Sequence, residues 1–367
     1  MHSCTQSKKT KYLNLVSLFY APFYFVFFSF YFLFFAIISL MYRPLKKSII
    51  VPIKNQNLDG ITIIIPTWNK RDLIISCLQN LDQILVKNNL DVPFEIIVIE
   101  NGSQDESLLA LRKLQLQTSL SVLPQKENLG FSRAINLAVS KANYNYIYLM
   151  NNDMIVQKNT FPALIKYAQK LIAQKDYFFA IASHILPIDQ NSYNHESGKT
   201  FVNFRLGFIH VGHLLKKTEL QKDNKTFYAG GGSSLFNKHL FSILGGYDYN
   251  SYQPLYVEDL DLSYLAAKLG YQSHFCYNSK IIHHHRSSTK MLQIDPDLII
   301  QKNFLIFLWK NLSSPYYVFQ HLFFYPLQII LKPKYCRYSI EAFKNIYQVF
   351  KQRLIIAKKF ILLPDEF

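Results

Sequence analysis

Between residues 61 and 153, short apolar runs alternate with segments of helical spacing, and this alternation restricts the fold more than any other feature. The apolar runs predict buried strands at 61–66, 94–100, 119–123 and 146–150. The segments between them predict helices at 70–82, at 106–116 and at 131–140. Repeated strand–helix units favour an α/β fold with an open, mostly parallel sheet and flanking helices.

Polar turns follow these strands at their carboxyl ends, where ligands bind to open α/β sheets. Pro66-Thr67-Trp68-Asn69 follows the first strand, and Glu100-Asn101-Gly102-Ser103 follows the second. A carboxylate in such a turn can accept a hydrogen bond from the imide N–H of a pyrimidine base, and a glycine lets backbone approach a ligand. Asn-Gly turns are also common connectors, so each turn alone fits a structural role as well.

Asp153 ends the turn Asn151-Asn152-Asp153 after the fourth strand. Its carboxylate could bind a divalent cation that neutralises a diphosphate, or it could serve as a helix cap. His283 begins a run of three histidines, which suits either a metal site or a solvated turn.

Residues 155–290 have a less regular pattern and are expected to complete the sheet and form the second half of a cleft. Glu258, Asp259 and Asp261 lie within four positions and repel one another. A metal, a cationic ligand or solvent can compensate such a cluster, and burial could turn one carboxylate into a general base. The alternative is an acidic helix N-terminus stabilised by the helix dipole.

The N-terminal region predicts a membrane anchor. Tyr12 to Tyr42 contains no charged residue and would span about 45 Å as a helix, more than the ~30 Å hydrocarbon core. Arg43 and Lys46 follow it, which favours an uncleaved anchor (1–47) and a linker (48–59) over a signal peptide. Basic residues balance on the two sides, so charge does not set the orientation.

The C-terminal region (291–367) is expected to form membrane-associated helices. Residues 311–331 lack Asp, Glu, Lys and Arg but contain two prolines, which fits either a spanning helix or broken helices in the interface. The segment after it mixes basic and apolar residues. That pattern suits anionic headgroups, or equally a terminal helix with a solvated basic face.

The net charge of +16 suggests an anionic partner, but the sequence contains no recognised nucleic-acid module, so nucleic acid is not expected as a partner. The four scattered cysteines, Cys4, Cys77, Cys276 and Cys336, form neither a zinc motif nor a disulfide framework.

Taken in order, these motifs resemble family 2 of the inverting glycosyltransferases, particularly its rhamnosyltransferase-like bacterial members. The resemblance covers roughly residues 60–290. The matching stretches are 61–69, 97–103, Asn128-Leu129-Gly130-Phe131, 149–153, Gly245-Gly246-Tyr247-Asp248, 258–262 and 279–283.

The resemblance implies a GT-A fold with a Rossmann-like nucleotide-binding half (60–153) and an acceptor-binding half (154–290). It implies Asp259 as the catalytic base, and Asp153 and His283 as ligands of a divalent cation, Mn or Mg. Glu100 stands where aspartate is usual in the family, and Asn151 replaces the first acid of the metal motif. The other implied contacts are Pro66, Thr67, Asn69, Glu100, Asn128, Gly130 and Asn152 for the nucleotide, and Gly231, Gly232, Asp248 and Glu258 for the acceptor.

The implied reaction moves a sugar from a UDP- or dTDP-linked donor to a hydroxyl of a glycan or polyprenyl-linked acceptor, in cell-surface polysaccharide synthesis. Because nucleotide sugars are made in the cytoplasm, the expected location is the cytoplasmic (inner) membrane, with a single-pass anchor and a cytoplasmic catalytic domain. The alternatives are a membrane-tethered non-catalytic binding protein and a sugar-phosphate nucleotidyltransferase. The latter normally has a Gly-rich phosphate loop after its first strand.

Overall fold

The computed structural model describes residues 57–188, 196–222, 224–284 and 295–359, together with Pro22, Ser29 and Asp365. The predicted anchor (1–47) lies outside the described residues apart from Pro22 and Ser29, as does most of the predicted linker (48–59). No helix in the described part of the chain has both the length and the hydropathy needed to cross a bilayer.

The predicted nucleotide-binding half (60–153) has the predicted parallel strands, in the order β3-β2-β1-β4. Their bounds agree with the sequence to within one residue: β1 (Ile61–Thr67), β2 (Phe94–Glu100), β3 (Ser119–Pro124) and β4 (Tyr146–Met150). The connecting helices are α2 (Arg71–Asn88), α3 (Ser107–Lys113) and α4 (Phe131–Val139). Helix α2 is longer than predicted because Leu85 continues its buried face until Asn89 turns left-handed, whereas α3 ends early because Leu114 is extended.

The second half makes the sheet mixed: β6 and β11 pair in parallel, whereas β10, β5 and β9 run antiparallel to their neighbours. The full order is β3-β2-β1-β4-β10-β6-β11-β5, and β10 runs antiparallel to both of its neighbours. The elements are β5 (Met154–Val156), α5 (Thr160–Ala173), β6 (Phe178–Pro187), α6 (Lys217–Leu220), β9 (Lys225–Thr226), β10 (Ser233–Asn237), α7 (Lys238–Ile243), α8 (Glu258–Lys268) and β11 (Gln272–His283). A separate hairpin consists of β7 (Thr200–Arg205) and β8 (Phe208–His213).

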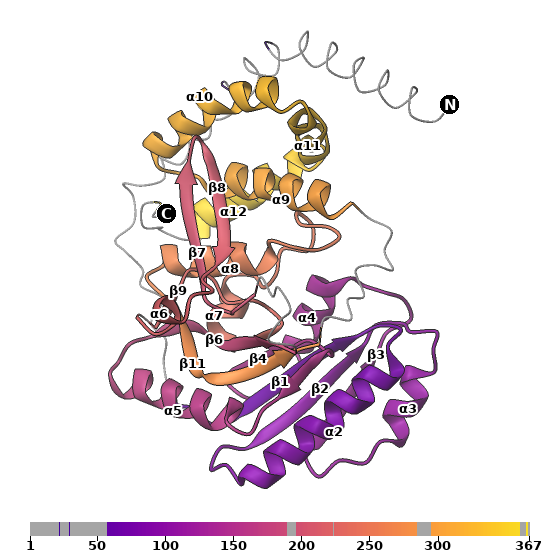
Figure 1. Ribbon diagram of the computed structural model, residues 1–367. Coiled ribbons are helices and arrows are strands. Elements are labelled where there is room, and N and C mark those ends of the chain that lie inside the picture. The colour runs from indigo at the N-terminus through magenta and orange to yellow at the C-terminus, as the bar shows by residue number, and fades with distance from the viewer. Residues whose placement is uncertain are drawn as a thin grey trace.

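Apolar side chains bury both faces of the main sheet. Residues of α2 and α5 pack against one face, and residues of α4, α7 and α8 pack against the other. A third cluster joins the hairpin and α8 to the C-terminal helices, with Trp309 fully buried in it. These helices are α9 (Pro296–Asn311), α10 (Pro315–Leu331), α11 (Lys334–Phe343) and α12 (Ile346–Lys359). They lie at the end of the molecule opposite α2 and α3, and the hairpin extends from the sheet toward α10 (Figure 1).

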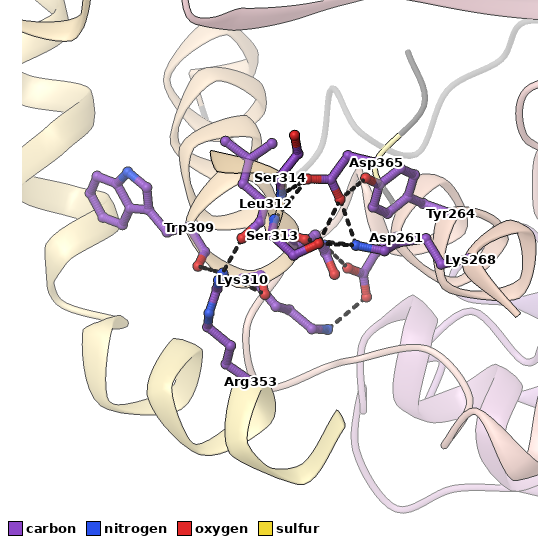
Figure 2. Close-up of polar contacts among 11 residues, drawn as sticks. Asp261, Tyr264, Lys268, Trp309, Lys310, Leu312, Ser313, Ser314, Arg353 and Asp365 are labelled. Atoms are coloured by element: carbon purple, nitrogen blue, oxygen red, sulfur yellow. Dashed lines mark hydrogen bonds and ion pairs between the residues drawn. The ribbon is translucent and has the colours of Figure 1, made fainter. Parts of the chain in front are cut away.

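Buried charges connect α8 to the C-terminal helices. Nζ of Lys310 on α9 lies 2.7 Å from Oδ2 of Asp261 on α8 and 2.8 Å from Oδ2 of Asp248. Nζ of Lys268 lies 2.5 Å from Oδ1 of Asp365, and Arg353 of α12 donates to the carbonyl oxygens of the last turn of α9 (Figure 2). Because these groups are almost completely buried, each charge relies on its protein partners rather than on water.

Candidate active site

Strand pairing brings Asp153 and His283 together. Asp153 lies in the turn between β4 and β5, and β5 pairs antiparallel with the end of β11 so that Met154 faces His283. The backbone N–H of His284 donates to the carbonyl of Asp153 (2.8 Å), and Nε2 of His283 lies 3.3 Å from Oδ1 of Asp153. The two residues predicted to bind a cation are therefore neighbours.

Glu196 completes this cluster from the segment that precedes β7. Its Oε2 lies 3.0 Å from Nδ1 of His283, so both ring nitrogens face a carboxylate. Burial lowers the pKa of His283, but the carboxylates of Asp153 and Glu196 raise it more strongly, to about 9. Glu196 was not predicted as a site residue from the sequence, since no motif surrounds it.

The residues present fit a divalent cation. Oδ1 of Asp153 is buried and has no hydrogen-bond partner that meets the geometric criteria, although Nε2 of His283 lies 3.3 Å from it. Within the described ranges no group of three or more His, Cys, Asp or Glu side chains forms a complete metal site. One carboxylate and one imidazole would leave the other positions of such an ion to substrate phosphates and water. Glu196 can orient the imidazole as an outer partner.

Asp259 lies in the first turn of α8, with both carboxylate oxygens close to backbone amides. The N–H of Leu260 donates to Oδ1 (2.8 Å), and the N–H of Gly231 approaches Oδ2 at 3.4 Å. Burial raises the pKa of Asp259, these amides partly oppose the increase, and the charge of Glu196 adds to it. Glu196 therefore acts electrostatically on the predicted base and also contacts the predicted cation ligand His283.

A strained turn presents this end of α8. Tyr256 and Val257 have φ values of +75° and +80°, a conformation that is unusual for a β-branched residue such as valine. The buried Asn303 of α9 donates from Nδ2 to the carbonyls of Leu255 and Tyr256, both at 2.9 Å. Side-chain hydrogen bonds from the C-terminal helices thus hold the turn that positions Asp259.

Glu258 precedes the predicted base and is also buried. Its Oε2 has no hydrogen-bond partner. Burial and the charge of Asp259 raise the pKa of Glu258 to about 8. A protonated Glu258 would leave Asp259 as the only negative charge of this adjacent pair near neutral pH, while Asp261 pairs with Lys310.

The Gly230–Gly232 loop joins the two halves of the site. Its backbone approaches Asp259, and a side chain at Gly231 would lie 2.7 Å from the hydroxyl of Tyr247. At Gly232 a side chain would lie 2.7 Å from the amide of Asn151, which belongs to the turn 151–153 that contains Asp153. These glycines therefore allow the loop backbone to pack closely against Tyr247 and Asn151. A contact of Gly231 and Gly232 with an acceptor stays a prediction.

The predicted nucleotide turns interlock at the carboxyl ends of β1 and β2. Buried Glu100 accepts from the N–H of Ser103 (2.6 Å), and the Ser103 hydroxyl accepts from the N–H of Asn69 (3.0 Å). Oδ1 of Asn69 in turn accepts from the N–H of Gln104 (2.7 Å). Pro66 and Thr67 end β1 in register with Ile99 and Glu100.

The remaining predicted nucleotide residues extend this edge. Asn101 donates to Oδ1 of Asn128 (2.8 Å), which also accepts from the N–H of Gly130 at the start of α4. Asn152 donates from Nδ2 to the hydroxyl of Thr67 (2.9 Å), and this bond links the turn 151–153 to the end of β1. Hydrogen bonds thus connect four segments that are separate in the sequence, at 66–69, 100–103, 128–130 and 151–153.

Asp248 has a structural partner that the sequence did not indicate. Besides the ion pair with Lys310, it accepts from the N–H of Ser251 (3.1 Å), and its side chain is largely buried. Burial raises the pKa of Asp248, but the charge of Lys310 and the hydrogen bonds from Lys310 and Ser251 together lower it below its ordinary value. Asp248 therefore fixes its loop to α9 through Lys310. Its contact with an acceptor stays a prediction.

Comparison with known proteins agrees with this architecture. Residues 62–241 match the sequence profile described as "Glycosyl transferase family 2". The chain is 29% identical over 122 residues to chondroitin synthase of Pasteurella multocida (strain Pm70), covering 32% of this chain and 12% of that protein. It is 28% identical over 102 residues to poly-beta-1,6-N-acetyl-D-glucosamine synthase of Staphylococcus aureus (strain MSSA476), covering 28% and 24%. The chain thus matches about a quarter or less of the length of these relatives.

A solved structure shows the same fold. The structure of GalNAc-T7 with UDP, GalNAc and Mn²⁺ superposes with a TM-score of 0.53 at 18% identity, covering 72% of this chain and 50% of that chain. The fold is therefore a GT-A-like α/β mixed sheet with flanking helices. The profile match ends at residue 241, so Glu258, Asp259 and His283 lie beyond it.

Proposed function

We propose, from the match of residues 62–241 to the glycosyl transferase family 2 profile, that the protein transfers a sugar, with inversion, from a UDP- or dTDP-linked donor to an acceptor hydroxyl. The convergence of Asp153, His283 and Asp259 around Glu196 carries the proposal. Asp153 contacts His283, His283 contacts Glu196, and the charge of Glu196 acts on Asp259. A donor diphosphate and an acceptor hydroxyl could therefore meet in one place.

Three groups of residues would bind the nucleoside, hold the cation and accept the proton. The turns around Asn69, Glu100 and Asn128 would bind the nucleoside at the end of β1 and β2. Asp153 and His283 would hold a divalent cation, which supplies charge neutralisation for the leaving diphosphate. Asp259 would accept the proton of the attacking hydroxyl, and its raised pKa makes it a stronger base than an ordinary aspartate.

The substrates and the location are part of the same proposal. Both named relatives are synthases of polysaccharides by name, which supports a glycan or a polyprenyl-linked glycan as the acceptor. The uncharged run from Tyr12 to Tyr42 supports a single-pass anchor in the cytoplasmic membrane. The donor is cytoplasmic, so the catalytic domain would face the cytoplasm. A reporter fusion that placed residue 60 on the outer side would contradict this topology.

The decisive experiment compares the wild-type protein with Asp259→Asn on a panel of nucleotide sugars with Mn²⁺. We expect metal-dependent release of nucleoside diphosphate from one donor class, slower by about 10²–10⁴-fold in the variant. Nucleotide affinity should be nearly unchanged, because Asp259 lies outside the turns at β1 and β2. Near-normal turnover of Asp259→Asn would refute the assignment of the base, and retained anomeric configuration in the product would refute inversion.

A further inference from the structure

Helix α10 is apolar on both of its faces, and the described residues of the protein cover only one of them. Its inner face contacts the tip of the β7–β8 hairpin, where His321 hydrogen-bonds the carbonyl of Gly207, and the aromatic cluster around Trp309. The buried inner residues are Val318, His321, Tyr325 and Ile329. The exposed residues recur at helical spacing on the other face: Tyr316, Phe319, Phe323, Leu327 and Ile330.

This exposed row is unusual for the surface of a water-soluble domain. A helix at a protein surface normally carries charged or polar residues on its outer face, but α10 contains no Asp, Glu, Lys or Arg. Phe319 and Phe323 stack on each other with their centroids 6.3 Å apart. Leu331 extends the row to the end of the helix. A continuous aromatic and aliphatic row of this kind marks an interaction surface.

The charges around α10 indicate what covers it. Residues 295–359 contain ten Lys and Arg against three Asp and Glu. Lys332, Lys334 and Arg337 follow the helix directly and are exposed. The ion pairs of Lys334 with Asp297 and of Arg337 with Asp295 are also exposed, so solvent screens them. An apolar row bordered by surplus positive charge complements an anionic lipid surface, with acyl chains beside the row and headgroups beside the basic residues.

The predicted N-terminal anchor would keep α10 close enough to the membrane surface to contact it. If Tyr12 to Tyr42 crosses the bilayer, fourteen residues (43–56) separate it from the described domain. Fully extended, they reach about 50 Å. Helix α10 lies at the far end of the molecule from α2 and α3 (Figure 1), so the domain can present this end to the membrane while the β1 and β2 edge stays in water.

We propose that the outer face of α10 lies in the interface of an anionic bilayer, parallel to the membrane plane. This docking surface extends the proposed membrane location and does not depend on the transfer chemistry. It would hold the candidate active site at a fixed orientation to the membrane, because α9 connects α10 to the turn that carries Asp259.

Spin labelling of the full chain in nanodiscs containing phosphatidylglycerol tests the proposal. One nitroxide is attached to Phe323→Cys (native side chain 55% exposed) and a second, in a separate variant, to Ile330→Cys. The matched control is Leu109→Cys on α3, where the native side chain is 50% exposed. Cys4 and Cys336 are replaced by serine, whereas Cys77 and Cys276 are buried and can remain.

We expect labels at positions 323 and 330 to be more accessible to oxygen than to a water-soluble nickel chelate, and the label at 109 to show the opposite preference. Accessibility at 323 and 330 equal to that at 109 would overturn the proposal, since the face would then be in water. Protection from both reagents would also overturn it, because protein, either residues 1–56 or a second copy, would then cover the row. None of these readings depends on enzymatic activity.

Discussion

Nζ of Lys310 lies 2.7 Å from Oδ2 of Asp261, so an ammonium group on α9 pairs with a carboxylate on α8, the helix whose first turn contains the proposed base Asp259. The same ammonium group also pairs with Asp248 in the loop before that helix. Burial lowers the pKa of Lys310, but the two carboxylates raise it above its ordinary value, so the side chain stays charged. The C-terminal helices are therefore part of the structure that holds the candidate active site.

Replacing Lys310 with methionine should destabilise the protein strongly. The substitution fills similar space but leaves Asp248 and Asp261 as uncompensated buried charges, a change that typically costs about 3–5 kcal/mol. Chemical denaturation should show this loss. Lys334→Met is the matched control, because its ion pair with Asp297 is exposed and should change stability little. Equal effects of the two substitutions would contradict the importance of the buried cluster.

Glu258 should make stability depend on pH. Its pKa is about 8 in the folded protein and ~4.3 in an unfolded chain, so the folded state binds the proton more tightly. This contribution is fully present below pH ~4.3, declines as the pH rises and is lost above about 8. The difference in unfolding free energy between wild type and Glu258→Gln should therefore change steadily across this window, in denaturant titrations at several pH values. A constant difference would rule out the raised pKa.

Replacing Glu196 with glutamine should weaken cation binding. Glu196 faces Nδ1 of His283, and loss of such an outer partner typically costs about 10–100-fold in metal affinity. Calorimetry with Mn²⁺ in the presence of UDP measures the change. Asp176→Asn is a matched control, since Asp176 approaches Nε2 of His274 at 3.7 Å at the other end of β11. Unchanged Mn²⁺ affinity in Glu196→Gln would show that Glu196 does not support the ligand.

Gly102→Ala should lower the melting temperature and the affinity for UDP more than Gly270→Ala does. Gly102 has φ +73°, and a Cβ there would lie 2.7 Å from the backbone of Glu127. Gly270 has φ +91° but nothing within 4 Å, so Gly270→Ala carries only the conformational cost of about 1–2 kcal/mol. Thermal melts and UDP titrations of both variants should show the larger losses in Gly102→Ala. Similar losses would mean that the contact with Glu127 relaxes freely.

The sequence predicted the nucleotide half well because its signals are local. Each of β1 to β4 is a short apolar run ending in a polar turn, and parallel strands place all these turns at one edge. The predicted pair Asp153 and His283 also meet, since β5 returns beside β11. The antiparallel direction of β10 was not predictable in the same way, because it depends on the path of a long irregular connection rather than on the residues of the strand.

Other features depend on long-range contacts that no short motif records. Glu196 lies in a segment without regular pattern, yet it contacts His283. Asn303 and Lys310 lie on a helix whose sequence reads as apolar with occasional polar positions, and their importance is visible only once α9 packs on α8. The sequence motif at Asp248 indicated an acceptor pocket, whereas its structural role depends on that distant lysine.

The cluster of Asp248, Lys310 and Asp261 has a consequence for where this protein can be divided. The family match ends at residue 241, and the motif pattern ends near residue 290. A fragment truncated at either point would lack Lys310, and one ending near 290 would keep both aspartates without their counter-ion and uncover the aromatic face of α8. The recognisable homology therefore does not delimit an autonomous folding unit, and this catalytic half could be grafted into another protein only together with its own helices.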